Sequence, residues 1–189
     1  MPDDPLLDER VGALVDAVGA RTPAPGAGAV TGLAATLAAA LATMVARFSD
    51  DESAARACEL LRLRLAPLAD ADGAAYERFL EAVRLPREDP DRGERMSVTL
   101  SAATDVPMQL VELATEVAER AARLALEGNP RLRGDAVAAA LVAAAAARSA
   151  AVLVADNLGG RAGCADDTRP ARARALGAKA QAAADTLTS

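Results

Sequence analysis

A turn rich in proline and glycine leads directly into a long uncharged stretch, and this junction has the clearest chemical meaning in the sequence. Residues 22–29 read Thr-Pro-Ala-Pro-Gly-Ala-Gly-Ala, and residues 27–46 carry no charge. Gly26 and Gly28 let backbone N–H groups face outward at the first turn of the following helix, where four amides lack partners and the helix dipole is positive. Such a junction is a cradle for an anionic or carbonyl-bearing ligand. The same pattern is also typical of a plain turn before a buried helix.

Histidine is absent from the chain, which limits the chemistry that any site can use. His-based triads, most zinc sites and an imidazole general base are excluded. Catalysis would use carboxylates, Arg, Tyr, Lys179, hydroxyls or backbone amides. The two cysteines, Cys58 and Cys164, lack a metal-ligand spacing, and the acidic start of the chain is not that of a secretory signal. We therefore expect a cytoplasmic protein with two free thiols.

The composition predicts a single all-helical domain with an alanine-rich core. Of the 189 residues, 52% are hydrophobic but only 2% are aromatic, and tryptophan is absent. The core must therefore consist of Ala, Leu and Val from closely spaced helices. No stretch alternates β-branched and polar residues as a strand would. The net charge of −6 and the scattered basic residues argue against a nucleic-acid partner.

Helix-starting and helix-ending residues divide the chain into about six helices of an antiparallel bundle. Asp4-Pro5 has the form of a helix start, and Ser49-Asp50-Asp51-Glu52 that of a capping box. Pro107 falls inside the longest helix and is expected to kink or split it. The expected helices are residues 5–19, 27–48, 49–68 with a continuation from 70 to 83, 90–127, 135–158 and 169–187.

Two segments are long and apolar enough to span a membrane, namely residues 27–46 and 136–155. Alanine dominates both, and it drives membrane insertion weakly compared with Leu, Ile and Phe. Neither segment has an aromatic belt or a basic flank. We interpret them as central helices that are buried on all sides and make no membrane contact, with part of their cover supplied by a second subunit of a homodimer. A membrane-associated helical protein is the alternative.

Short motifs follow one another in a recognisable order. They are Thr22-Pro-Ala-Pro-Gly-Ala-Gly-Ala29, Leu37-Ala-Ala-Ala-Leu-Ala-Thr-Met-Val45, Asp72-Gly-Ala-Ala-Tyr76, Leu85-Pro-Arg87, Asp105-Val-Pro107, Gly128-Asn-Pro130, Asp135-Ala-Val-Ala138 and Asp156-Asn-Leu158. In this order, and over roughly residues 5–185, the chain resembles the cyclodeaminase domain of formiminotransferase-cyclodeaminase. It equally resembles the stand-alone methenyltetrahydrofolate cyclohydrolases of the same family.

The resemblance implies an all-helical homodimer that acts on a tetrahydrofolate carrying a one-carbon unit, with no metal and no organic cofactor. The reaction would be loss of ammonia from 5-formimino-tetrahydrofolate or hydration of methenyl-tetrahydrofolate to the 10-formyl compound. Asp72 would be the acid–base group, because a carboxyl shielded from water by alanine-rich helices can have a raised pKa. Considered by itself, Asp72 is better explained as the N-cap of a restarting helix, and the resemblance makes the two explanations equal.

The resemblance also suggests how the substrate would be held. Gly26 and Gly28 would supply backbone amides, and Asp135, the second catalytic candidate, would bind the pterin through paired hydrogen bonds. Tyr76, one turn after Asp72, would stack on the pterin. By themselves, Asp135 is typical of an N-cap and Tyr76 of a core aromatic. Three arginines would pair with the glutamate tail of the folate, although each alone is typical of a solvated surface: Arg87, Arg131 and Arg133.

The chain departs from the family's usual residues at several of these motifs. Pro-Gly-Gly-Gly-Ser is usual where this chain has Pro25-Gly-Ala-Gly-Ala29, so one glycine and one hydroxyl are lost. Gly134 stands in place of a Ser, Arg87 in place of a Lys, and Leu153-Val154 in place of Asn-Val. These departures favour an alternative from another class, a non-catalytic relative that keeps the bundle and the dimer but has an eroded site.

Overall fold

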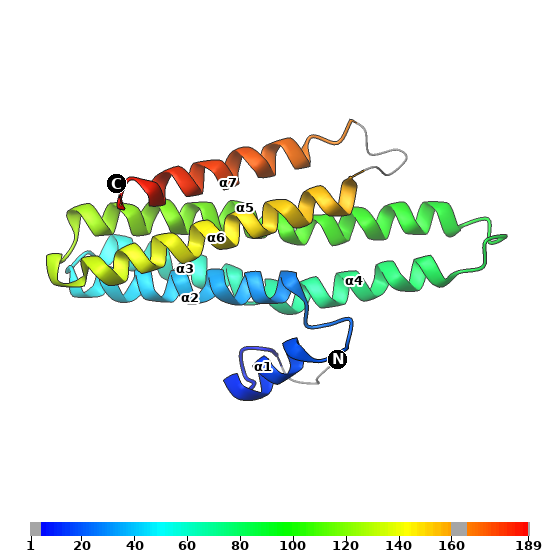
Figure 1. Cartoon of the computed structure of the whole chain (residues 1–189), viewed down its shortest axis with the longest axis horizontal. Coiled ribbons are helices and arrows are strands. Elements are labelled where there is room, and N and C mark those ends of the chain that lie inside the picture. Colours follow the sequence, from blue (N-terminus) through cyan, green and yellow to red (C-terminus); the bar gives the residue numbers. More distant parts are fainter. Residues whose placement is uncertain (1–4, 160–165, 189) are drawn as a thin grey trace.

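The computed structural model describes residues 5–159 and 166–188, and all regular elements within these ranges are helices. Six of them, α2 to α7, run lengthwise beside one another as a bundle, and the short α1 lies outside it (Figure 1). This confirms the prediction of an all-helical antiparallel bundle. The helices are α1 Val11–Gly19, α2 Ala27–Phe48, α3 Glu52–Leu65, α4 Leu68–Arg84, α5 Arg92–Glu127, α6 Arg133–Leu158 and α7 Arg169–Asp185, with a 3₁₀ turn at Pro130–Leu132 before α6.

Local turn chemistry explains why two predicted helix starts are wrong. The first helix begins at Val11, because the preceding described residues form a turn in which the Asp8 amide donates to the Pro5 carbonyl at 2.9 Å; Asp4 lies outside the described residues. Asp51, rather than Ser49, caps α3, and its side chain accepts from the Ala54 amide at 2.9 Å.

The third predicted helix is two helices, and the break falls earlier than expected. Pro67 stands between α3 and α4 and has no N–H to donate to α3. The two helices follow one another in the same direction and together run back along α2 (Figure 1). The restart therefore lies at Leu68 and not after Asp70, which changes the interpretation of every residue on α4.

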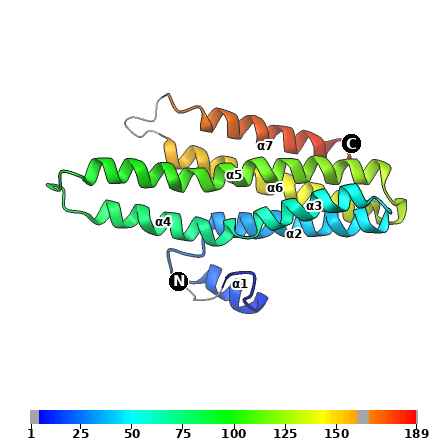
Figure 2. The ribbon, with the colours of Figure 1, turned by 180° about the vertical axis from the view of Figure 1, so that it is seen from behind.

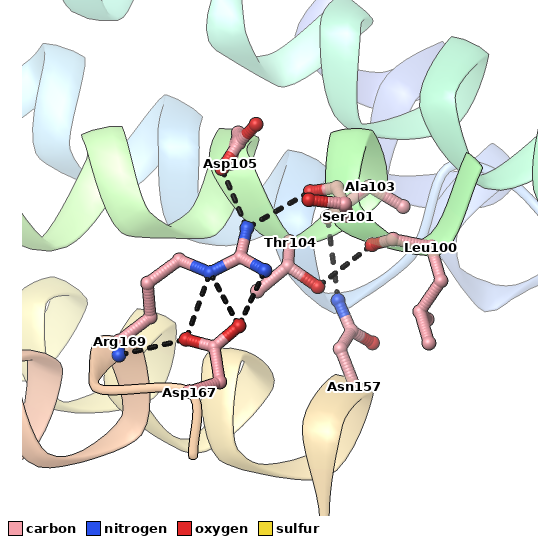
Figure 3. Close-up of polar contacts among 8 residues, drawn as sticks. All are labelled: Leu100, Ser101, Ala103, Thr104, Asp105, Asn157, Asp167 and Arg169. Carbon is pink, nitrogen blue, oxygen red and sulfur yellow. Dashed lines mark hydrogen bonds and ion pairs between the residues drawn. The ribbon is translucent and has the colours of Figure 1, made fainter. Parts of the chain in front are cut away.

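The long helix α5 is continuous through Pro107, so of the two predicted outcomes, a kink or a split, the split does not occur. Proline has no N–H for the carbonyl four residues earlier, which belongs to Ala103. The side-chain amide of Asn157 on α6 donates a hydrogen bond of 3.3 Å to that carbonyl (Figure 3). A neighbouring helix thus replaces the hydrogen bond that proline removes.

The two alanine-rich helices α2 and α6 lie side by side, and each is buried on one face only. The hydroxyls of Thr31 and Ser149 join them with a hydrogen bond of 3.0 Å. Leu37 of α2 is 66% exposed and Val152 of α6 is 57% exposed, so the expectation of burial on all sides is wrong for a single chain. Both helices are long and apolar enough to cross a membrane by length and composition, and 61% and 50% of their most apolar windows are buried inside the protein.

The shared outer face of α2 and α6 therefore remains apolar and uncovered. It faces the viewer in Figure 1, whereas Figure 2 shows the opposite side, with α5 and α4 in front of α6 and α2.

Of the two cysteines, Cys58 is a buried free thiol and Cys164 lies outside the described residues.

Candidate functional site

The first turn of α2 has backbone amides without a hydrogen-bond acceptor among the described residues, and two of its residues, Gly28 and Ala29, are buried. Gly26 is the N-cap and has extended backbone, and no side chain of the described residues caps the helix. The Gly26 carbonyl accepts from the Val30 amide at 3.1 Å, so the amides of residues 27–29 precede the first intrahelical hydrogen bond. These amides and the positive end of the helix dipole favour an anionic or carbonyl oxygen.

Asp72 lies in the core-facing row of α4, where an amphipathic helix normally has an apolar residue. Leu68, Ala75 and Phe79, which precede and follow it at spacings of three or four residues, are all buried. Its carboxyl group lies directly against Gly28 of α2, because a Cβ atom at Gly28 would overlap the carboxyl carbon and both oxygens. The structure thus brings together two of the residues proposed from the sequence.

The environment of the Asp72 carboxyl suits proton transfer. Burial raises the pKa of this carboxyl above its ordinary value, because desolvation disfavours the charged form. None of the described residues donates a hydrogen bond to it or forms an ion pair with it. Since Asp72 is the fifth residue of α4, its interpretation as an N-cap is wrong. A carboxyl group with these properties can both hold and release a proton closer to neutral pH.

A second glycine sets how closely α2 and α4 approach. Gly32 lies one turn after Gly28, and a Cβ atom there would be 3.2 Å from the backbone N and Cα of Ala69. The two contacts differ in kind. Backbone opposes Gly32 and cannot move aside, whereas the end of a side chain opposes Gly28. Gly32 therefore serves helix packing, and Gly28 governs where the Asp72 carboxyl lies.

The N-terminal segment closes the outer side of this helix crossing. Leu6 is buried, and its amide donates a hydrogen bond of 3.1 Å to the Asp70 carboxylate, which lies on α4 two residues before Asp72. The cavity left between Leu6, Pro25 and Gly73 is only about 40 Å³, which admits water and not an organic ligand. Any larger ligand must approach the Asp72 carboxyl from another side.

Two further predicted residues lie on or beyond α4, with different outcomes. Tyr76 lies one turn after Asp72 and is 43% exposed, so it is not a core aromatic and its ring is accessible. Arg87 is exposed in the connection from α4 to α5, fifteen residues beyond Asp72. Since helical residues rise by about 1.5 Å each, Arg87 lies on the order of 20 Å from Asp72 along the bundle.

Asp135, Arg131 and Arg133 lie at the opposite end of the bundle from Arg87. Asp135 is the third residue of α6 rather than its N-cap, and it precedes Ser149 by fourteen residues, or about 21 Å of helix. Arg133 donates to the Leu187 carbonyl at 3.0 Å and ties α6 to the end of the chain. Arg131 is exposed. Within one chain, these residues do not meet the contact between Gly28 and Asp72.

The sequence-based reasoning missed one polar pair beside this contact. Thr31, one turn after Gly28, is 4% exposed, and its hydroxyl is within hydrogen-bond distance of the Ser149 hydroxyl on α6. The available signal was weak, because Ser149 is the one hydroxyl residue of residues 136–155 but Thr31 is one of three threonines in residues 27–48. The pair fixes the register of α2 against α6 next to the candidate site.

These features define a helical-bundle protein with a candidate acid–base site where the glycine-containing start of α2 meets a half-buried carboxyl. The sequence profile of the formiminotransferase-cyclodeaminase family matches residues 10–169. The chain belongs to this family.

Individual relatives agree with this assignment. The chain is 32% identical over 149 residues to the formimidoyltransferase-cyclodeaminase of Sus scrofa, which covers 71% of this chain but 28% of that protein. The chain therefore spans little more than a quarter of that relative. It is 29% identical over 168 residues to the methenyltetrahydrofolate cyclohydrolase of Methylorubrum extorquens, with 81% of each chain covered. The crystal structure of a formiminotetrahydrofolate cyclodeaminase from Thermotoga maritima superimposes with a TM-score of 0.80 at 26% identity, covering 96% of this chain and 93% of that one.

Proposed function

We propose that this chain is an enzyme of one-carbon folate metabolism that closes or opens the methenyl bridge of tetrahydrofolate. The observation that carries the proposal is the unpaired, half-buried Asp72 carboxyl against Gly28, at the open start of α2. The names of the relatives, cyclodeaminase and cyclohydrolase, support this substrate class. Both reactions require one group that moves a proton at the bridging carbon, and we assign this role to Asp72.

In hydration, the Asp72 carboxylate would accept a proton from water as the water oxygen bonds to the methenyl carbon. Protonated Asp72 would then return its proton to N5 as the bond from that carbon to N5 breaks, and loss of the hydroxyl proton to water leaves the formyl group on N10. In deamination, N10 would attack the formimino carbon, protonated Asp72 would give its proton to the formimino nitrogen, and the carboxylate would then carry the N10 proton to the same nitrogen, so that ammonia leaves and the methenyl bridge closes. The amides at the start of α2 would hold a carbonyl or anionic oxygen of the folate, and Tyr76 would lie against the pterin.

We further propose that the protein works as a homodimer in the cytoplasm, without membrane attachment. The uncovered apolar face of α2 and α6 supports the dimer, because a face of this kind marks an interaction surface. The proposed hydration and deamination use only a carboxyl group, backbone amides and water, and they therefore call for no metal or organic cofactor.

The test follows the absorbance of methenyl-tetrahydrofolate with the purified protein. The protein should accelerate either the loss of this band or its appearance from 5-formimino-tetrahydrofolate, and the direction decides between the two activities. Asp72→Asn should lower kcat by about 100-fold or more, since general acid–base groups contribute this much. Glu77→Gln, which alters an exposed acid on the same helix, should leave kcat unchanged.

One alternative is kept because the glycine-rich turn and the α6 end differ from the family pattern at Ala29, Gly134 and Leu153. The chain would then be a non-catalytic relative that keeps the bundle. A protein that binds a folate analogue in calorimetry but converts neither substrate would support this alternative. Normal turnover by Asp72→Asn would refute the role of Asp72.

A further inference from the structure

We propose that Asp70 is a positioning residue, which holds residues 5–25 against the crossing of α2 and α4 as the back wall of the candidate site. The proposal rests on the folate chemistry proposed above and adds the residue that keeps the acid–base group of that chemistry in place. Residues 5–25 are called the back-wall segment. They comprise the turn that begins at Pro5, the helix α1 and the proline-rich turn that leads into Gly26.

The back-wall segment is attached to the bundle mainly at one end. Among the described residues, its one hydrogen bond to the bundle runs from the Leu6 amide to the Asp70 carboxylate, at 3.1 Å. Leu6 is also its one buried residue, and it packs with Ala29 of α2 and Ala69 of α4. Helix α1 has no buried residue and lies beside the bundle (Figure 1). One leucine and one hydrogen bond are a small part of what folds a domain, so the segment can detach while the bundle stays folded.

The point of attachment lies directly behind the contact between Gly28 and Asp72. Ala29 follows Gly28 in the first turn of α2, and Asp70 and Gly73 lie on either side of Asp72 on α4. Ala29, Asp70 and Gly73 line the cavity of about 40 Å³ beneath the segment. Since this cavity admits water but no organic ligand, the segment supports the site from behind and does not touch the substrate.

A closed back wall limits the water that reaches the Asp72 carboxyl from this side. Desolvation raises the pKa of this carboxyl, and no charged group among the described residues contributes to the shift. Detachment of the segment would admit water, so the pKa would fall toward the ordinary value of 3.8. The titratable groups on the surrounding elements are Asp70, Tyr76 and Glu77 of α4, Asp105 of α5, Asp156 of α6, and Asp8, Glu9 and Arg10 of the segment; residues 27–46 of α2 carry no charge.

Asp70 has a second, purely local role from which the proposed one can be separated. It is the acidic residue in the first turn of α4, where a negative charge interacts favourably with the helix dipole. Asparagine at this position removes the charge but keeps an oxygen that can accept from the Leu6 amide. Alanine removes both. A difference between the two variants therefore reports the hydrogen bond and not the charge.

The first experiment measures the attachment without reference to activity, by amide hydrogen exchange of the full chain. Asp70→Ala should raise the exchange rates of residues 6 and 27–29 by about 10-fold and leave α5 and α6 unchanged. Leu6→Ala, which leaves α4 unaltered, should do the same. Asp70→Asn should exchange like the unmodified protein, as should the matched control Asp16→Ala, which removes an exposed acid of α1. Unchanged exchange in Asp70→Ala, or equal increases in Asp70→Ala and Asp70→Asn, would overturn the role of Asp70.

The second experiment follows turnover against pH, with whichever of the two folate substrates the protein converts. Asp70→Ala and Leu6→Ala should each lower kcat by about 10-fold, because the acid–base group is less well placed. KM should change by less than about 2-fold, since the segment does not touch the substrate. The limb of the pH profile that reports Asp72 should move to lower pH, and Asp70→Asn should restore both the limb and kcat. The double variant of Leu6→Ala with Asp70→Ala should be no worse than either single variant, because both open the same wall.

The outcomes separate this inference from the proposed function. A smaller folded fraction would lower kcat but would not move the limb, so an unmoved limb overturns the positioning role. Faster exchange with unaltered kcat would mean that Asp70 attaches the segment without positioning Asp72, and the folate activity would still stand. A protein without activity on either substrate refutes the proposed function and the positioning role with it, and the exchange rates then decide the attachment alone.

Discussion

Two polar regions of the bundle contain sequence motifs that carry the resemblance to the family. They differ in whether their polar groups have hydrogen-bond partners. In one, around Pro107, three helices meet and polar groups have partners from neighbouring segments. Asn157 donates to the Ala103 carbonyl, and Arg169 binds Asp167, Asp105 and the Ser101 carbonyl at 2.6 to 3.2 Å (Figure 3). In the other, the Asp72 carboxyl contacts Gly28 and receives no hydrogen bond from the described residues.

The difference separates structural from chemical roles among motifs that look alike in the sequence. A network in which each polar group has a partner stabilises a single arrangement of helices. Hydrogen bonds from Arg169, first through its side chain and then its backbone, lower the pKa of Asp167, so this carboxylate stays charged and is not suited to proton transfer. An unpartnered, desolvated carboxyl such as Asp72 costs stability and is therefore a candidate for function.

The largest effect is expected from adding one methyl group at Gly28. Gly28→Ala places a Cβ atom where the Asp72 carboxyl lies, and this end of a side chain can rotate away. We expect kcat to fall by about 100-fold, because the acid–base group is displaced, while the melting temperature changes little. Steady-state turnover and thermal denaturation measure the two effects.

Two glycine controls make this test specific. Gly32→Ala meets the Ala69 backbone at 3.2 Å, so it should lower stability by about 1–3 kcal/mol through overpacking. Gly93→Ala meets nothing within 4 Å and should change neither property. If Gly28→Ala turned over normally, or lost only stability as Gly32→Ala should, the distinction between the two glycines would be wrong.

The partnered region should show the opposite behaviour, a loss of stability with little loss of catalysis. Asn157→Leu leaves the Ala103 carbonyl without its donor, which should cost about 1–3 kcal/mol in the free energy of unfolding. Pro107→Ala restores an N–H that can bond to the same carbonyl within α5. The double variant should therefore lose less stability than the sum of the two single variants, and an additive result would contradict the replacement of the helix bond by Asn157.

A smaller effect is expected from the charge of Asp72 itself. Because burial raises its pKa in the folded state, the protonated form is favoured there, and stability is lost as the pH rises through the folded-state pKa. Asp72→Asn cannot ionise, so it should be more stable than the unmodified protein at neutral pH. The difference should vanish below the ordinary carboxyl pKa of 3.8. Urea unfolding at several pH values measures this, and an increase of the difference in acid would contradict the sign.

The fold was largely predictable because its signals are local. Alanine-rich uncharged stretches, capping residues and glycine stops predicted α2 with its observed bounds, Ala27–Phe48. The errors arose where a distant segment decides the outcome. A proline such as Pro107 is expected to interrupt a helix, because it has no N–H to donate. The reason that α5 continues is the hydrogen bond from Asn157, fifty residues later in the sequence.

The candidate site was predictable in its residue types but not in its assembly. The absence of histidine directed attention to carboxylates, and the resemblance selected Asp72 and Gly28, which the structure places in contact. The sequence could not show that Asp72 sits in the buried row of α4, because that required locating the helix start at Leu68. The resemblance assigned Asp135 and Arg131 to the same site, but within one chain the length of α6 keeps both far from this contact.

The smallest effect on stability is expected at Asp105, the most exposed member of the partnered region around Pro107. This residue tests whether every hydrogen-bonded group in that region contributes to stability. The Asp105 side chain is 59% exposed, and Arg169 keeps its bonds to Asp167 and to the Ser101 carbonyl when Asp105 is removed. Asp105→Ala should therefore cost less than about 1 kcal/mol, and high salt should reduce this cost because exposed ion pairs are screened. Urea unfolding at low and high ionic strength measures both. A salt-independent loss as large as that of Asn157→Leu would mean that Asp105 supports α5 directly, so that the network depends on its exposed member as much as on its buried ones.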